Sequence, residues 1–303
     1  MRIGTSLTSS YRVSDAREGA RWMIERAAAA REAGLDWLFV GDHHATPEQY
    51  YQNTPMMGRL LAEWGNAPFG CLFLLPLWHP VLLAEQVGTL ASIGQGRFIL
   101  QCGLGYGARQ FAAMGASMRT RPSAFEESLG AVKRLLAGET VNASGRFHFE
   151  KASISPVPPE PVEYWIGASA DVAIDRAARL GDGWLAAPSV TPDEARAQIA
   201  TYRDACARHG RVPAAVAIRR DIYVGDSKAD VEEVAGRMVE HGYRGFDPAA
   251  LVYGTVDEVA AKFRELAAMG YTDVIVRHMG VPQEKVLASM GRLKEVRAAV
   301  VEL

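Results

Sequence analysis

Short runs of apolar and β-branched residues alternate with longer segments of helical spacing along almost the whole chain. The first run, RIGTSL, precedes an Ala/Arg/Glu-rich stretch over 15–33, whose spacing predicts a helix that ends at Gly34. The same order recurs as far as DVIVRHM, which precedes a last helix from about 282. We count eight apolar runs, each followed by a helical segment.

The predicted strands are RIGTSL, DWLFVG, FGCLFLL, RFILQCG, YWIGA, GWLAAP, AVAIRRDIYVG and DVIVRHM. The predicted helices cover 15–33, 54–64, 80–93, 122–137, 170–180, 192–209, 228–242, 255–269 and the segment from about 282. Thr54 is expected to cap one helix, with Pro55 at its first position. Thr255 and Glu258 form the pattern of a capping box at another.

The segment 105–163 is longer than an ordinary loop between a strand and a helix. It contains the predicted helix 122–137 and a predicted hairpin, ETVNASGRFHFE, and it ends in the proline-rich SPVPPEP. We interpret it as an insertion after the fourth strand, a lid or a dimer element within a single domain of residues 1–303.

Strands that alternate with helices indicate parallel pairing, because parallel neighbours need crossover connections. Eight such units predict an α/β fold, the (β/α)₈ or TIM barrel. The alternative is a doubly wound open sheet, which would be expected to carry a dinucleotide-binding fingerprint after its first strand. GTSLTSSY is not such a fingerprint.

Composition excludes several classes of function. The chain of 303 residues is 49% hydrophobic with a formal net charge of −2, so neither nucleic acid nor an anionic membrane is an expected partner. The most apolar window, APFGCLFLLPLWHPVLLA, is interrupted by prolines and a histidine and predicts no membrane-spanning helix. The start, MRIGTSLTSS, lacks a signal pattern, and three cysteines without a C-x-x-C pair fit a reducing cytosol. We therefore expect a cytoplasmic protein.

In a barrel the active site lies at the carboxyl ends of the strands. The second strand ends in Asp42, His43 and His44, and a histidine there is suited to donate a hydrogen bond or to act as a general acid or base. The alternative is that one histidine packs and the other caps the next loop. The strand-end position favours a functional role for one of the two.

Two further strand ends suggest ligand contacts. GLGYG, after the fourth strand, contains Gly103, Gly105 and Gly107, which would let a planar ligand touch the main chain, although glycine-rich turns are common. IGASADVAIDRAA predicts a strand, a small turn and a helix N-terminus that would bind an anion, with Ser169 as a donor, as the N-cap, or as both. Arg121 could add a charged contact or lie on the surface.

We predict no metal site. The side chains of adjacent His43 and His44 lie on opposite faces of an extended strand, and the fifth and sixth strands end without metal-ligating side chains. No G-x-S-x-G nucleophile motif occurs. A cofactor is therefore expected to carry the chemistry.

The chain resembles the bacterial-luciferase-like family of flavin-dependent oxidoreductases. The resemblance rests on GLDWLFVGDHH, on LPLWHPVLLAEQVGTLASIGQGRFILQCGLGYGARQFAAMG, on RPSAFEESLGAVKRLLAGETVNASGRFHF and on YWIGASADVAIDRAARLGDGW, with YTDVIVRHM near the end. It implies a (β/α)₈ barrel that binds reduced FMN or the deazaflavin F420, and a homodimer.

The resemblance also implies roles for single residues. His43 holds the position of the catalytic histidine in luciferases. The cofactor phosphate would lie at Gly167, Ala168 and Ser169, beside Arg121. The flavin ring would lie against the third and fourth strands, with a strained peptide near Cys71–Phe73. The cofactor-binding positions expected on those two strands are Leu72, Gly103, Leu104 and Gly105.

Three positions depart from the family pattern. Asp42 replaces the glutamate of luciferases, Gln110 replaces a glutamate of many relatives, and Leu104 stands where luciferase has an arginine. The Asp-His pair also resembles F420-dependent members of the family.

The leading hypothesis is a monooxygenase that uses reduced FMN and O₂ to oxidise a small organic substrate. NAD(P)H would supply the electrons, directly or through a separate flavin reductase. The alternative is an F420-dependent oxidoreductase that transfers hydride without oxygen, and a third reading is a flavin-binding protein without turnover. Loops such as 45–53 are expected to contact the substrate, whose identity the sequence does not indicate.

Overall fold

The computed structural model describes residues 1–301, and in it the predicted alternation forms β-strands and α-helices. The strands are β1 (Arg2–Leu7), β2 (Leu38–Val40), β3 (Phe69–Leu74), β4 (Phe98–Gly103), β5 (Val141–Ser144), β6 (His148–Ala152), β7 (Glu163–Gly167), β8 (Gly183–Ala186), β9 (Ala215–Val224), β10 (Val252–Gly254) and β11 (Asp273–His278).

The helices are α1 (Ala16–Glu32), α2 (Asn53–Trp64), α3 (Pro80–Ile93), α4 (Ala108–Ala113), α5 (Arg121–Leu136), α6 (Asp171–Leu180), α7 (Pro192–Arg208), α8 (Lys228–Val231), α9 (Arg237–Glu240), α10 (Val256–Met269) and α11 (Gln283–Val301). The eight predicted strands and the helices between them form a (β/α)₈ barrel, which confirms the predicted fold class. In barrel order these strands are β1, β2, β3, β4, β7, β8, β9 and β11.

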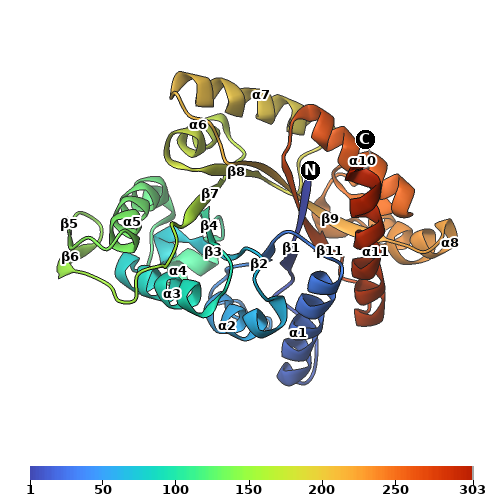
Figure 1. The fold of residues 1–303 in the computed structure, drawn as a ribbon, viewed down its shortest axis with the longest axis horizontal. Coiled ribbons are helices and arrows are strands. Elements are labelled where there is room, and N and C mark those ends of the chain that lie inside the picture. Colours follow the sequence, from blue (N-terminus) through green and yellow to red (C-terminus); the bar gives the residue numbers. More distant parts are fainter. Residues whose placement is uncertain (302–303) are drawn as a thin grey trace. The chain divides into compact units, whose positions relative to one another are not determined.

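The chain divides into two compact units. Unit 1 comprises residues 1–8, 21–38 and those from 165 onward, and unit 2 comprises 9–20 and 39–164. In unit 1, β11 pairs in parallel with both β1 and β9, and β8 pairs with β7 and β9. Helices α10 and α11 lie side by side in this unit, as do α6 and α7 (Figure 1).

Aromatic side chains fill much of the core of unit 1. Trp184 on β8 stacks against Tyr202 at 4.9 Å and against Tyr271 at 6.0 Å between ring centroids. Trp37 meets Trp165 edge to face and donates a hydrogen bond of 2.9 Å from its Nε1 to Asp273. Because the indole N–H of Trp37 is satisfied, this large ring can be buried at little polar cost.

In unit 2, β3 and β4 form a parallel pair whose register runs from Phe69 opposite Phe98 to Leu74 opposite Gly103. A Cβ at Gly70 would lie 1.9 Å from the backbone oxygen of Ile99, so only glycine permits this approach of the two strands. The pairing brings the carboxyl ends of both strands to one level, where a (β/α)₈ barrel carries its active site.

The insertion contains the predicted hairpin, formed by the antiparallel strands β5 and β6, and the predicted helix, α5. It also contains a short helix, α4, that the sequence analysis did not predict. Whether the insertion acts as a lid or a dimer element stays a prediction.

Three local predictions need correction. Thr54 does not cap α2, because the helix begins at Asn53 and Gln52 is its N-cap residue. The predicted helix 228–242 is divided by a π-helical turn between α8 and α9. The strand β10 was missed, since its three residues are too few to show an alternation. The capping box at α10 is confirmed, with the carboxylate of Glu258 2.9 Å from the N–H of Thr255.

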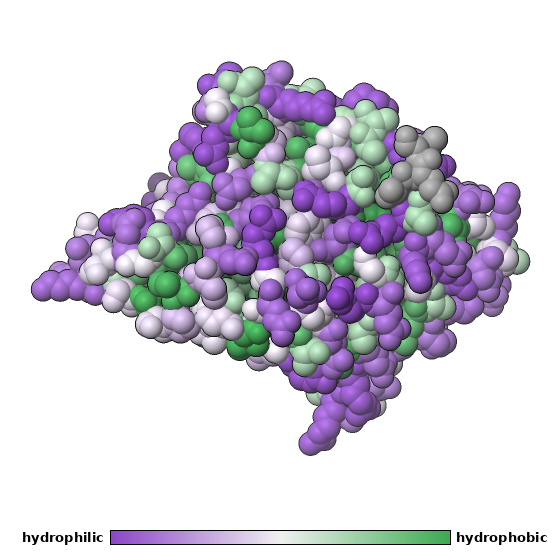
Figure 2. Space-filling view, viewed as in Figure 1, coloured by the Kyte–Doolittle hydropathy of each residue, from purple (hydrophilic) through white to green (hydrophobic). Residues whose placement is uncertain are grey.

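Hydrophilic side chains cover most of the face shown in Figure 2, and the apolar residues on it occur in small groups. Within residues 1–301, none of the helices combines the length and the apolar character needed to cross a membrane.

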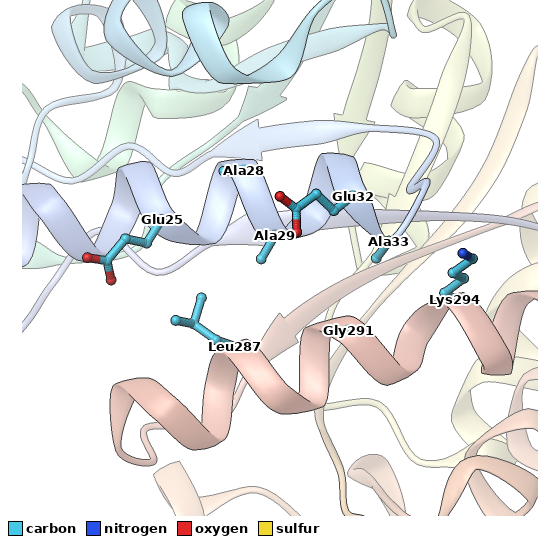
Figure 3. A pocket seen from close by; sticks show the side chains of 8 residues that line it. All are labelled: Glu25, Ala28, Ala29, Glu32, Ala33, Leu287, Gly291 and Lys294. Carbon is cyan, nitrogen blue, oxygen red and sulfur yellow. The ribbon is translucent and has the colours of Figure 1, made fainter.

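A groove of about 460 Å³ lies between α1 and α11 in unit 1 (Figure 3). Its floor is made of small residues such as Ala28, Ala29 and Gly291, and its edges carry Glu32 and Lys294. Short side chains on both helices account for this groove, which gathers no nucleophile or histidine.

Candidate active site

Asp42, just beyond β2, anchors the end of the neighbouring strand. Its carboxylate is buried, and Oδ2 accepts hydrogen bonds of 2.8 Å from the backbone N–H of Leu74 and of 2.8 Å from Nε1 of Trp78. Leu74 is the last residue of β3, and Trp78 follows the 3₁₀ turn after it. One carboxylate therefore fixes the carboxyl end of β3 and the chain that leaves it.

His44 is the histidine held by the protein. Its Nε2 lies 3.1 Å from Oδ1 of Asp42, and neither atom has a hydrogen-bond partner elsewhere in the described residues. The backbone N–H of His44 donates to Oε1 of the buried Gln110 at 2.6 Å, and its ring meets Trp78 edge to face. These contacts occupy the His44 side chain.

His43 is the histidine left open. Its half-buried ring lies beside Tyr50 with centroids 5.7 Å apart, and it forms no ring hydrogen bond within residues 1–301. Burial lowers the pKa of His43, the charge of Asp42 opposes that shift, and His44 adds to it. A neutral imidazole near pH 7 is suited to accept a proton or to donate one hydrogen bond to a ligand.

The glycines at the end of β4 and just beyond it, Gly103 and Gly105, are explained by contacts within the protein. A Cβ at Gly103 would lie 2.8 Å from Cδ2 of Leu74 and 3.1 Å from Cδ1 of Leu72. Gly105 has a φ of +75°, and a Cβ there would lie 2.8 Å from the ring of Phe111. The structure thus brings Leu72 and Gly103 together, and packing alone is a sufficient reason for both glycines. The predicted contact of these residues with a flavin ring stays a prediction.

The strand β3 is regular where the resemblance implies a strained peptide. Cys71, Leu72 and Phe73 pair in register with β4, and in the described chain the cis peptide bond lies elsewhere, at Ser155–Pro156. The Asn53 side chain donates a 2.7 Å hydrogen bond to the carbonyl of Leu72. The pairing with β4 and the Asn53 contact tie this peptide to its neighbours, and the expected strain stays a prediction.

Two of the predicted cofactor contacts in unit 2 are only partly enclosed. Leu104 is half-buried directly after β4, and Arg121 is the half-buried first residue of α5. The guanidinium of Arg121 contacts the sulfur of Met118 at 3.3 Å and forms no ion pair within residues 1–301. Arg121 is therefore available to an anionic ligand.

The predicted phosphate-binding turn lies in unit 1. Gly167 and Ser169 are exposed, while Ala168 is buried and its carbonyl accepts a 2.9 Å hydrogen bond from Nε1 of Trp184. The N-cap of α6 is Ala170, and no side chain caps the helix, so Ser169 is not the N-cap. The first N–H groups of α6 thus have no competing side-chain acceptor, as a phosphate-binding helix N-terminus requires.

His278 ends the last strand, and its buried Nε2 has no hydrogen-bond partner within residues 1–301. It is buried, and burial together with the charge of Arg26 lowers its pKa to about 3. Among residues 1–301, no group of three or more His, Cys, Asp or Glu side chains could hold a metal ion.

The sequence did not predict the contacts that fix Asp42 and β3, which involve Asn53, Leu74 and Trp78. No local pattern predicts them, because each lies on a different segment from its partner. Gln110 was noticed only as a departure from the family pattern, because its burial and its bond to His44 are visible only in the structure.

Several enzymes are similar to this chain in sequence. Over 96% of each chain, the protein is 25% identical to an F420-dependent glucose-6-phosphate dehydrogenase of Nakamurella multipartita. Several further relatives named in the same way are matched over less than two thirds of their own length.

Two solved structures share the fold. The monooxygenase RslO1 from Streptomyces bottropensis superposes with a TM-score of 0.86 at 22% identity, covering 97% of this chain and 98% of that one. The oxygenating constituent of 3,6-diketocamphane monooxygenase from Pseudomonas putida, a type II Baeyer-Villiger monooxygenase in complex with FMN, gives 0.82 at 19% identity, covering 97% of each chain.

The family model described as luciferase-like monooxygenase matches residues 1–251, which is most of the chain. That match includes every residue for which the sequence predicted a contact with the cofactor or a catalytic role. The protein is an oxidoreductase and belongs to the luciferase-like monooxygenase family.

Proposed function

We propose that this chain is an F420-dependent oxidoreductase that transfers a hydride between the deazaflavin and a small organic substrate. The observation that carries the proposal is the similarity to an F420-dependent dehydrogenase over 96% of both chains. The open imidazole of His43 supports it, because a dehydrogenase needs a group that takes a proton from the substrate hydroxyl or returns it to the carbonyl.

The residues present fit such a cofactor. In the described chain the ring of His43 has no hydrogen-bond partner, the N-terminus of α6 has no side-chain cap, and Arg121 has no carboxylate partner. F420, when bound, would supply or accept the hydride. Ser169 and the first N–H groups of α6 would hold its phosphate, and Arg121 is available to an anionic group.

His43 would hold or move the proton at a ring nitrogen. Asp42 would position the site in two ways. Its hydrogen bonds to Leu74 and Trp78 fix the end of β3, and its contact with His44 holds that ring away from His43. The apolar side chains of Leu72 and Leu74 would exclude water from the ring of the cofactor.

The second candidate is the FMN-dependent monooxygenase that the sequence resemblance placed first. The two monooxygenases of similar fold support it. Those structures are less than 25% identical to this chain and show the fold alone, whereas the similarity of the dehydrogenase extends through the sequence. We therefore rank F420 ahead of FMN and reverse the order expected from the sequence. The third hypothesis, a flavin-binding protein without turnover, has no support in a family of oxidoreductases.

A titration of the purified protein distinguishes the candidates. Oxidised FMN, reduced FMN under anaerobic conditions, and F420 are titrated into separate samples while the heat of binding is followed by calorimetry. We expect saturable binding of F420 that is tighter than binding of either form of FMN. Saturable binding of reduced FMN without binding of F420 would replace the proposal with the monooxygenase.

The homodimer remains a proposal, as does the cytoplasmic location. A separate flavin reductase would be needed only by the FMN candidate.

A further inference from the structure

Three arginines of unit 1 surround one buried aspartate. Arg219 and Asp221 are two positions apart on β9, so their side chains lie on the same face of the strand. Arg277 on β11 is the register partner of Asp221. Arg244 approaches from the loop between β9 and β10.

Both oxygens of Asp221 are already engaged within the cluster. Its Oδ1 lies 3.3 Å from Nη2 of Arg219, and its Oδ2 accepts hydrogen bonds from Arg244 and, at 2.9 Å, from the hydroxyl of Tyr243. The carboxylate is fully buried, and the charges of the three arginines lower its pKa even though burial opposes them. Arg277 donates from Nε to the hydroxyl of Thr8 at 3.3 Å and makes no ion pair within the described chain.

The cluster therefore carries more positive than negative charge. Nε of Arg219 is buried and has no hydrogen-bond partner in residues 1–301. Burial, reinforced by the charge of Arg277, lowers the pKa of Arg219 to about 10. One aspartate opposes three guanidinium groups, and like charges held together in a partly buried place are unfavourable unless an anion joins them.

A purely structural role for the cluster leaves two observations unexplained. To hold the loop against β9, Asp221 needs only the ion pair with Arg244. Arg219 and Arg277 are not needed for that contact. Arg244, moreover, has a φ of +52°, a conformation that a residue with a side chain adopts at a cost. Its guanidinium also lies 4.6 Å from the centroid of the Phe246 ring, so this strained residue is held in place on two sides.

The position in the fold suits a ligand. In barrel order β9 and β11 are the seventh and eighth strands, and Asp221 and Arg277 lie near their carboxyl ends. Barrels of this type frequently bind oxyanions after these two strands. The fork of an arginine side chain matches the paired oxygens of a carboxylate or phosphate.

We propose that Arg219, Arg244 and Arg277 bind an oxyanion with at least two free oxygens, a carboxylate or a phosphate monoester, and that this group belongs to the substrate. The assignment to the substrate rests on the proposed function, whereas the binding of the anion does not. Asp221 orients the arginines and leaves a net positive charge for the ligand.

The test is an isothermal titration of the purified full chain with inorganic phosphate and, separately, with acetate, at constant ionic strength. We expect saturable binding of at least one anion. Arg219→Gln and Arg277→Gln should each weaken it roughly tenfold or more, which is the cost of one charge-assisted hydrogen bond. Whether phosphate or acetate binds more tightly identifies the chemical source of the oxyanion.

Two further variants serve as controls for the binding experiment. Arg208→Gln removes a surface arginine that pairs with Asp175 at 2.8 Å, and it should bind the anion as the parent does. Asp221→Asn removes the opposing charge and should tighten binding if it folds, as circular dichroism would show. If the cluster had only a structural role, Asp221→Asn would weaken anion binding, as Arg219→Gln and Arg277→Gln do.

Absence of saturable binding, or binding that Arg219→Gln and Arg277→Gln leave unchanged, would overturn the proposal. The second result would place the anion elsewhere, for example at the N-terminus of α6. Anion binding that depends on the arginines in a protein that binds neither F420 nor FMN would retain the site and reject the proposed function.

Discussion

Oδ1 of Asp42 lies 3.1 Å from Nε2 of His44, while the ring of the adjacent His43 makes no hydrogen bond within the described residues. The two histidines that end the second strand therefore differ in role. One is held by the carboxylate that also fixes β3, and the other is free to meet a ligand.

Replacing the open histidine should reduce turnover. We expect His43→Gln to lower kcat by about 10²- to 10⁴-fold, the usual contribution of a general acid or base, with cofactor binding nearly unchanged. His44→Gln should weaken the local network and retain more activity, because its ring faces Asp42 and Trp78. Steady-state kinetics with the cofactor that the titration selects, together with binding of that cofactor to each variant, measure both effects. Full activity in His43→Gln would refute the proposed role.

Removing the anchoring carboxylate should destabilise the fold. Asp42→Ala leaves the N–H of Leu74 and the indole N–H of Trp78 without their acceptor. A buried donor that loses its partner costs about 1–3 kcal/mol, and we expect the free energy of unfolding in urea to fall by at least that amount. Trp78→Phe removes only one of the two hydrogen bonds with a small loss of ring volume. A loss in Asp42→Ala no greater than in Trp78→Phe would show that the Leu74 bond contributes little.

Stability should decline as the solution becomes acidic, with His278 as a main cause. Its pKa in the folded state is lowered to about 3 by burial and Arg26, so between about pH 6.5 and pH 3 the unfolded chain binds the proton and the folded chain does not. The free energy of unfolding should therefore fall by about 1.4 kcal/mol for each pH unit in that window. The stabilising contribution is fully present above pH 6.5.

Urea unfolding of the parent, of His278→Gln and of the exposed-residue variant His148→Gln across pH 4–8 checks this prediction. The slope below pH 6.5 should decrease in His278→Gln and stay as in the parent in His148→Gln. Equal slopes in all three proteins would exclude His278 as the source.

A methyl group at Gly103 should be costly. Its Cβ would lie 2.8 Å from Cδ2 of Leu74, closer than side-chain carbons normally approach. Overpacking of this kind usually costs about 1–3 kcal/mol, so we expect Gly103→Ala to lower the melting temperature. Gly130 on α5 is exposed with nothing within 4 Å of a built Cβ, and Gly130→Ala should raise stability by about 0.5–1 kcal/mol. A neutral Gly103→Ala would mean that Leu74 moves freely, and the close packing described above would be wrong.

The secondary structure was largely predictable because its signals are local. The spacing over 15–33 predicted α1, the pair Thr255 and Glu258 predicted the start of α10, and the alternation around Ser144 predicted the hairpin. The start of α2 is a failure that involves a tertiary contact. Asn53 begins α2, and its side chain donates a hydrogen bond to the carbonyl of Leu72 on β3. The N-cap of the helix is therefore Gln52 and not Thr54.

The sequence by itself determined the order of strands and helices, and with it the barrel, because hydrophobic periodicity and capping depend on residues a few positions apart. It also placed His43 and His44 at a strand end. Only the tertiary structure decided that Asp42 holds His44 and leaves His43 open, that His278 is buried, and that Arg219, Arg244 and Arg277 gather around Asp221. These relationships depend on which strands pair and in what register, and pairing is a property of segments far apart in the chain.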